Sequence, residues 1–350
     1  MKRHLNTLFV QTQGAYLKKE GQAVVVRIEQ QTALRVPLHQ LDGIVMFGRV
    51  SASPFLLGAC AEAGVAVSML TERGRFLAAV VGYTPGNVLL RRTQLRLADS
   101  HDASLAIARP IIAAKIANLR TVLLRGTRDH GPPTDHETNP KTTSPLHAAA
   151  QRLAHDAQAA MQATTLDHLR GTEGESATTY FTAFNHLMTR HADAFRFDRR
   201  SRRPPMDPIN ALLSFLYTLL AHDYRSACEA AGLDAAVGFL HRDRPGRPSL
   251  ALDLMEALRP VLADRLALSL INRGQVKPDG FTTTESGSVA MDDATRKAVI
   301  TAYQKRKQDE LLHPFTQEKM PLGLVPHIQS RLLARTVRGD HDLYPEFIWR

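Results

Sequence analysis

Short apolar and β-branched runs, separated by polar turns, occupy the first part of the chain. They predict strands over Leu8–Gln11, Ala23–Ile28, Ala33–Val36, Gly43–Phe47, Ala66–Leu70 and Phe76–Val81. One helix is expected from Pro54 to Glu62, because proline is favoured in the first turn of a helix. Polar segments such as Lys18-Lys19-Glu20-Gly21 are expected to be turns. This pattern predicts a small β-rich domain.

The hydrophobic period changes after Pro85-Gly86, and apolar residues then recur at helical spacings. A proline-rich loop is expected over Asp129–Pro145, and a strand-like interruption over Phe281–Met291. Further helices are predicted over Leu146–Leu169, Gly174–Thr189, Pro208–Ala221, Leu250–Asp264, Asp292–Leu312 and Pro326–Arg338. Because strands and helices fall in separate blocks, we expect an α+β fold. Residues 1–84 would form the β-rich domain and residues 85–350 a larger all-α domain.

The 350 residues carry a formal net charge of +10, with 44 Lys and Arg against 34 Asp and Glu. Such a balance favours a polyanionic partner, although a basic enzyme charged only for solubility stays an alternative. The two cysteines, Cys60 and Cys228, indicate neither a disulfide framework nor a thiolate zinc site. No signal peptide or membrane-spanning stretch is found, so we expect a soluble, cytoplasmic protein without a membrane partner.

Three short islands carry the residues of greatest chemical interest. Glu173 lies in Gly171-Thr172-Glu173-Gly174, where Thr172 and Glu175 have the spacing of a capping box. We therefore expect a helix to begin here, with Glu173 left without a capping role. The flanking glycines allow close approach of backbone or ligand. Alternatively, Glu173 only complements the helix dipole.

His241 and a pair of carboxylates form the other two islands. His241 follows an apolar run and is expected where a buried helix end meets a polar loop, so a purely structural histidine stays open. Asp253 and Glu256 stand three apart, which puts both on nearly the same helix face. Their repulsion favours a cation between them, whereas a solvated acidic face balanced by Arg259 is the alternative.

In this order and spacing, the islands resemble the CRISPR adaptation integrases, the metal-dependent nucleases that install new spacers in a CRISPR array. The resemblance extends over essentially the whole chain. Residues 5–10, 37–39, 43–45 and 86–94 are most similar to the type I-C branch. Further matches are Tyr180-Phe181, residues 207–213, Arg259-Pro260 and Asp264.

The resemblance implies that Glu173, His241 and Glu256 bind Mg²⁺ or Mn²⁺, with Asp253 as a supporting acid. Many family members have Asp at the position of Glu256, so whether Glu256 or Asp253 is the nearer ligand stays open. An acid/base role for His241 stays open as well. The expected reaction is attack of a prespacer 3′-hydroxyl on a phosphodiester of the CRISPR repeat. The expected partners are double-stranded DNA, a second copy of the chain and a small second CRISPR adaptation subunit.

Clustered arginines are the candidate DNA contacts, because guanidinium groups suit phosphates. They are Arg91, Arg92, Arg96, Arg199, Arg200, Arg202 and Arg203. We expect the β domain to dimerise through edge strands and a Phe47–Phe55 surface, and Trp349 to belong to a docking tail or to be packed. Two other functions stay open: a stand-alone nuclease on branched DNA, and a non-catalytic DNA-binding scaffold.

Overall fold

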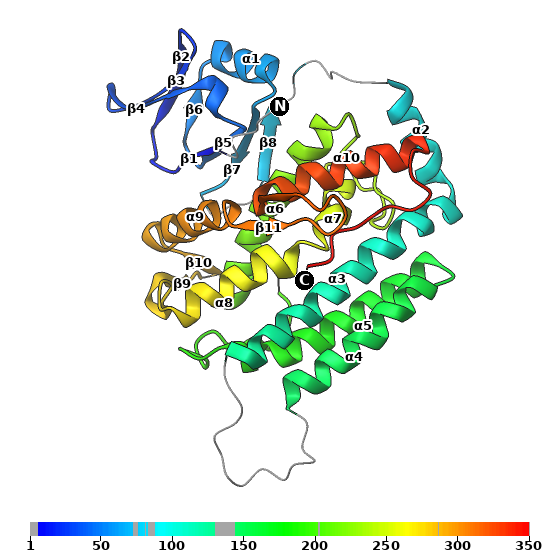
Figure 1. Cartoon of the computed structure of the whole chain (residues 1–350). Helices are drawn as coiled ribbons and strands as arrows, with labels where there is room; N and C mark the ends of the chain where they lie inside the picture. Colours follow the sequence, from blue (N-terminus) through cyan, green and yellow to red (C-terminus); the bar gives the residue numbers. More distant parts are fainter. Residues whose placement is uncertain are drawn as a thin grey trace.

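A β-rich N-terminal region is followed by a largely helical region, which confirms the predicted α+β class (Figure 1). The computed structural model describes residues 6–72, 76–80, 82, 88–129, 144–201, 204–285 and 287–349. The predicted domain boundary at residue 84 lies outside these ranges. No helix in the described ranges is both long and apolar enough to cross a membrane.

The N-terminal region contains two four-stranded sheets. The first has the order β1 (Thr7–Val10), β5 (Gly43–Phe47), β7 (Ala66–Leu70) and β8 (Phe76–Val80), with only the β7–β8 pair antiparallel. The second has the order β4 (Gln31–Pro37), β3 (Ala23–Ile28), β2 (Tyr16–Glu20) and β6 (Ser51–Ala52). The predicted strands are therefore present. The predicted helix is α1 (Pro54–Ala63), which Ser53 caps by accepting a hydrogen bond from the Leu56 N–H at 3.2 Å.

Strand β2 corrects the expectation of a turn at Lys18-Lys19-Glu20-Gly21. These lysines and Glu20 pair with β3, and the chain turns only at Gly21, where φ is +59°. Leu17 points into the core, while the polar residues after it lie at the rim or in solvent. A half-exposed strand of this kind contains few apolar residues, so the hydrophobic pattern does not distinguish it from a turn.

The first sheet joins the two regions because its side chains alternate between two cores. Ile44 and Met46 of β5 face the second sheet and α1, whereas Val45 and Phe47 face the helices. The Phe47 ring lies 6.0 Å from that of Phe215 on α6 (Pro208–Ala230). Phe47 is fully buried, so it cannot belong to the exposed dimerisation surface expected at Phe47–Phe55.

The C-terminal region is largely rather than purely helical. Its other helices are α2 (Val88–Asp99), α3 (His101–Asp129), α4 (Pro145–Gln162), α5 (Leu166–Phe184), α7 (Ser249–Met255), α8 (Arg265–Asn272), α9 (Asp293–Lys307) and α10 (Val325–Arg338). Two short antiparallel hairpins interrupt them, β9 (Phe281–Thr283) with β10 (Val289–Met291), and β11 (Glu310–Leu312) with β12 (Lys319–Pro321). The helix expected over Asp292–Leu312 therefore ends early. A π-helical turn, Arg259–Asp264, separates α7 from α8.

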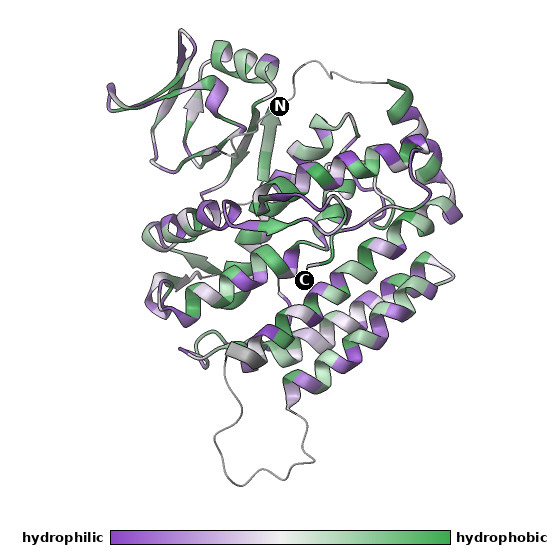
Figure 2. Cartoon of the chain, viewed as in Figure 1, coloured by the Kyte–Doolittle hydropathy of each residue, from purple (hydrophilic) through white to green (hydrophobic). Residues whose placement is uncertain are grey.

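Helices α3, α4 and α5 lie side by side (Figure 1), and hydrophilic and hydrophobic residues are interleaved along α4 and α5 (Figure 2). Helix α5 begins at Leu166, not near Thr172 as predicted, and its N-cap is Thr165, whose hydroxyl accepts from the His168 N–H. Thr172 lies mid-helix. The glycines at 171 and 174 lower helix propensity, but packing against α3 and α4 overrides that preference.

The C-terminal tail returns to α3, which agrees with the packed alternative for Trp349. Asn118 of α3 accepts a hydrogen bond from the Trp349 N–H at 2.7 Å and donates to the carbonyls of Phe347 and Ala257. The indole stacks under the Arg125 guanidinium, 3.6 Å from the ring centroid. The tail is thereby tied to the segment that follows α7.

Candidate active site

Asp253 is the buried anchor of the site. Its carboxylate is fully inaccessible and accepts hydrogen bonds from the backbone N–H groups of Phe239, Leu240 and His241, at 2.6, 3.0 and 3.0 Å. His241 Nδ1 lies 2.6 Å from the same carboxylate. A proton on Nδ1 then leaves the lone pair of this imidazole on Nε2, the arrangement of a carboxylate that orients a metal-binding histidine.

The segment that carries His241 is a tight loop, not the helix end expected from the sequence. Gly238 is required there, because a Cβ at this position would lie 2.8 Å from Asp253 Oδ2. Arg170 of α5 donates to the Leu240 carbonyl through both Nε and Nη2, at 3.1 and 2.5 Å. The loop is therefore held from α7 by Asp253 and from α5 by Arg170.

Glu173 lies one turn after Arg170 on α5, and its side chain is 30% exposed. The neighbouring Gly171 and Gly174 are exposed, and a Cβ at either position would meet nothing within 4 Å. The carboxylate forms an ion pair with the ammonium of Lys115 on α3. Glu173 therefore stands between a buried ion pair and an open surface.

Glu256 follows the last residue of α7 and turns away from Asp253. Its Oε2 lies 2.6 Å from Lys115 Nζ, and its Oε1 accepts from Arg259 at 2.5 Å. Within the described residues, Oε2 receives no hydrogen bond of good geometry, even though the ion pair is short. Burial alone would raise the pKa of Glu256, but Arg259, Lys115 and His241 outweigh burial and hold the pKa well below its usual range.

This geometry favours neither interpretation of the Asp253/Glu256 pair. The two carboxylates do not face each other, because Asp253 faces the loop and Glu256 faces Lys115. Nor do they form a solvated acidic face, since both are buried. Arg259 does balance the charge of Glu256, but it does so inside the protein. Its guanidinium stacks on Tyr217, 4.3 Å from the ring centroid.

Lys115 joins the two acidic islands. Its side chain is 8% exposed, and one ammonium contacts both Glu173 and Glu256. Burial alone would lower the pKa of Lys115, but the two glutamates raise it, so the group is a cation. Lys115 is not among the candidate residues named from the sequence. The available signal was its position in the apolar stripe of Ile111, Ile112, Ile116 and Leu119.

The donors present fit a divalent cation. Two carboxylates converge on one positive charge, and Asp253 fixes the imidazole of His241. Carboxylate oxygens suit both Mg²⁺ and Mn²⁺, whereas the imidazole suits Mn²⁺ better than Mg²⁺. Across the described residues, however, no three His, Cys, Asp or Glu side chains already stand close enough to hold an ion. Lys115 lies between two of them.

The predicted DNA-contacting arginines fall into three groups. Arg92 and Arg96 are exposed on α2, Arg91 is half-buried there, and Arg199 is exposed before α6. Arg200 binds inward, donating to Asn210 Oδ1 at 2.5 Å and to Ser214 Oγ at 3.1 Å. Arg202 and Arg203 lie outside the described residues.

The family model for the CRISPR associated protein Cas1 matches residues 8–305. The chain belongs to the Cas1 family. Among its relatives, the "CRISPR-associated endonuclease Cas1 1" of Chlorobaculum tepidum is 54% identical over 350 residues, covering 100% of both chains. The "CRISPR-associated endonuclease Cas1 2" of Rhodospirillum rubrum is 50% identical over 351 residues, again covering 100% of both. Membership in Cas1 confirms the predicted activity class, a CRISPR endonuclease and integrase of spacer acquisition.

Solved structures share the Cas1 fold. A Cas1 protein from Thermotoga maritima superposes with a TM-score of 0.81 at 20% identity, covering 97% of this chain and 99% of that one. A "casposase bound to integration product" gives 0.81 at 20% identity, covering 96% and 92%. A chain of a "Cas6-RT-Cas1–Cas2 complex" gives 0.78 at 24% identity, where the match spans 98% of this chain and 36% of that longer one.

Proposed function

We propose that this Cas1 family member uses Glu173, Glu256 and His241 Nε2 to hold one Mg²⁺ or Mn²⁺, with Asp253 orienting His241. The observation that carries the proposal is that carboxylates from α5 and from the end of α7 meet at one buried positive charge. Of the two acids left open by the sequence, Glu256 is the nearer ligand, because the loop amides and Nδ1 occupy Asp253.

We infer that the reaction is transesterification of DNA. A prespacer 3′-hydroxyl attacks a repeat phosphodiester, a new P–O bond forms, and the 3′-oxygen of the cut strand leaves; water replaces the hydroxyl in hydrolysis. When bound, the ion supplies charge neutralisation at the phosphate and lowers the pKa of an attacking oxygen. Glu173 would hold the ion from its partly exposed position on α5, and Arg259 keeps Glu256 ionised. His241 is assigned as a ligand, with acid/base catalysis as the alternative.

DNA binding is assigned to the exposed arginines of α2, Arg92 and Arg96, with Arg91, Arg199, Arg202 and Arg203 as further candidates. Exposed guanidinium groups can reach phosphates without losing an internal bond. Arg200 is the weakest member of the predicted set, because its guanidinium already binds Asn210 and Ser214.

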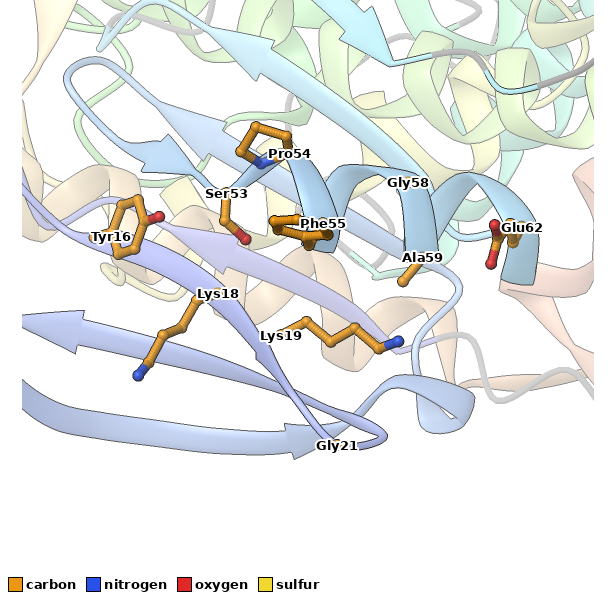
Figure 3. A pocket seen from close by; sticks show the side chains of 10 residues that line it. All are labelled: Tyr16, Lys18, Lys19, Gly21, Ser53, Pro54, Phe55, Gly58, Ala59 and Glu62. Carbon is orange, nitrogen blue, oxygen red and sulfur yellow. The ribbon is translucent and has the colours of Figure 1, made fainter.

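We propose that a second copy of the chain covers the groove between β2 and α1 (Figure 3). The groove measures about 710 Å³, and Tyr16, Lys19 and Phe55 line it. Phe55 is 84% exposed, an unusual state for so large an apolar side chain at the centre of a concave surface. A Phe55→Asp variant should sediment as a monomer at micromolar concentration; a wild-type monomer under the same conditions contradicts the proposal.

The finer assignments are proposals as well. The segments at 5–10 and 86–94 support a type I-C system, and a small second adaptation subunit is the proposed partner for full integration. The chain shares its fold with a chain of the "Cas6-RT-Cas1–Cas2 complex", and this similarity supports the proposed partner. A genomic DNA substrate and two free, buried thiols, Cys60 and Cys228, support a reducing cytoplasmic location.

The test compares Glu173→Gln with Glu175→Gln in strand transfer of a hairpin-ended prespacer into supercoiled repeat DNA. Both lie on α5, but Glu175 contacts only the exposed Arg152, at 3.5 Å. We expect Glu173→Gln to keep DNA binding and lose at least about 10³-fold in strand transfer, since the ion provides most of the electrostatic stabilisation. Glu175→Gln should match wild type.

Other outcomes identify the competing functions. Full strand transfer by Glu173→Gln would remove Glu173 from the catalytic site. Wild-type protein that binds DNA but neither cleaves nor transfers strands, even with the second subunit and Mn²⁺ present, would establish a DNA-binding scaffold. Cleavage of branched DNA by wild type, with no strand transfer even when the second subunit is added, would establish a stand-alone nuclease.

A further inference from the structure

Lys115 holds an unusual position for a buried lysine. Its ammonium contacts Glu173 of α5, whose side chain is partly exposed, and Glu256, which is buried just after α7. These are the two carboxylates assigned to the metal. The positive charge therefore stands where a divalent ion that engages both glutamates would need their oxygens.

A second buried lysine provides the reference. Lys307 of α9 lies 2.9 Å from Asp223 of α6, and the Tyr303 hydroxyl donates to the same carboxylate. There one lysine faces one acid, the ordinary stoichiometry of a structural pair. Lys115 instead shares its charge between two acids from separate helices, one of them partly exposed. A bridge of this kind is not needed to bury a single lysine.

The local charge also bears on the competition. Arg259 already neutralises Glu256 from its Oε1 side. With Lys115 in place the two glutamates are fully balanced by two cations, so an entering divalent ion brings excess positive charge unless the ammonium withdraws. Two like charges cannot share the same carboxylate oxygens inside a protein without a large electrostatic cost.

We propose that Lys115 is a built-in competitor for the metal: its ammonium holds Glu173 and Glu256 together in the metal-free protein and releases their oxygens when the ion binds. The proposal rests on the proposed metal site. Its consequence is regulatory, because the lysine sets the concentration of free divalent ion at which the enzyme becomes loaded. The same contact keeps the two carboxylates from repelling each other before loading.

The experiment measures Mn²⁺ affinity of the full chain without DNA, by electron paramagnetic resonance and calorimetry. Lys115→Met and Lys115→Gln remove the competing charge with an apolar and a polar side chain. Lys307→Met is the matched control, since it removes a buried lysine from its pair with Asp223, which is not part of the site. We expect both Lys115 variants to bind Mn²⁺ about tenfold tighter or more, because a charge-assisted contact no longer has to be broken. Lys307→Met should bind as wild type.

Melting temperatures give a second readout that also covers poor folding. Both Lys115→Met and Lys307→Met should melt earlier than wild type without metal, but saturating Mn²⁺ should restore only Lys115→Met. A Lys115→Met protein that folds only with Mn²⁺ present supports the proposal. Unchanged or weaker Mn²⁺ binding in both Lys115 variants overturns it.

Failure of this proposal is distinguishable from failure of the metal site itself. If Glu173→Gln binds Mn²⁺ as tightly as wild type, the site is wrong. If Glu173→Gln loses Mn²⁺ affinity while the Lys115 variants bind Mn²⁺ like wild type, the metal site is supported and the competitor role of Lys115 is wrong.

Discussion

Two polar clusters in this Cas1 protein contain similar residue types but arrange them differently. The junction cluster, where β7 meets α6, contains Ser68, His222, Asp223, Tyr303 and Lys307. The site cluster contains Lys115, Glu173, His241, Asp253 and Glu256. Each contains a histidine, a lysine and at least one carboxylate, so residue types alone do not distinguish the two clusters.

The junction cluster is closed and balanced. Its histidine bonds Ser68 Oγ through Nδ1 at 2.7 Å, and its single acid receives Lys307 and Tyr303. The cavity beside it measures about 20 Å³, room for about one water molecule. The site cluster has two glutamates on one lysine, and the side chain of one of them, Glu173, is partly exposed. This excess of acid oxygens at a partly exposed position, more than burial or residue type, supports the proposed cation site.

The largest contrast is expected from replacing the aspartate of each cluster by asparagine. Asp253→Asn should weaken Mn²⁺ binding and strand transfer about 10–100-fold, because the amide no longer fixes the Nδ1–H form of His241. Calorimetry and the strand-transfer assay measure these losses.

Asp223→Asn is the matched variant in the junction cluster. It should lower the melting temperature, since it leaves the buried Lys307 unpaired, yet bind Mn²⁺ normally. Equal loss of Mn²⁺ binding in both variants would show that the two clusters do not differ in function.

A smaller effect separates the clusters by pH. Burial lowers the pKa of His222 to about 4, although Asp223 opposes the shift, while Lys307 and Arg225 assist it. In the unfolded chain the pKa is near 6.5, so His222 contributes stability above that value that is lost as pH falls towards 4. The loss approaches about 3 kcal/mol.

His222→Gln should flatten this dependence in urea unfolding curves between pH 4 and 6.5. The readout is the difference between variant and wild type, because burial raises the pKa of Asp264 to about 6 and gives a contribution of opposite sign. Identical pH profiles for the two proteins would rule out the buried, neutral state of His222.

The smallest expected effect tests the DNA surface. Arg92→Gln and Arg96→Gln should each weaken DNA binding and reduce the slope of log affinity against log salt by roughly 0.9, because each removes one phosphate contact. Fluorescence anisotropy over a salt series measures the slope. Unchanged slopes in both variants would exclude α2 from the DNA interface.

The sequence predicted the fold best where apolar runs were uninterrupted, as in β3, β5 and α1. It failed at β2, where Lys18 and Glu20 are compatible with strand pairing that only β3 can provide. It failed at the start of α5 because Thr172 and Glu175 have the spacing of a capping box, while packing on α3 and α4 continues the helix through them.

The site was predictable in part. Glu173, His241 and Glu256 were candidates from their islands and from the Cas1 resemblance, and the structure brings Glu173 and Glu256 together at Lys115. The separate contacts of Asp253 and Glu256 could not be predicted, because the hydrogen bonds from the loop amides to Asp253 depend on the close approach that Gly238 allows. Lys115 was missed for a similar reason: its partners are 58 and more residues away, on other helices.

The most direct test of the central claim is a crystal structure with Mn²⁺ and its anomalous scattering. We expect one manganese peak coordinated by Glu173, Glu256 and His241 Nε2, with Asp253 still on Nδ1 and the Lys115 ammonium moved off the carboxylates. A peak bound by Asp253 instead, or no peak at this site at saturating Mn²⁺, would contradict it.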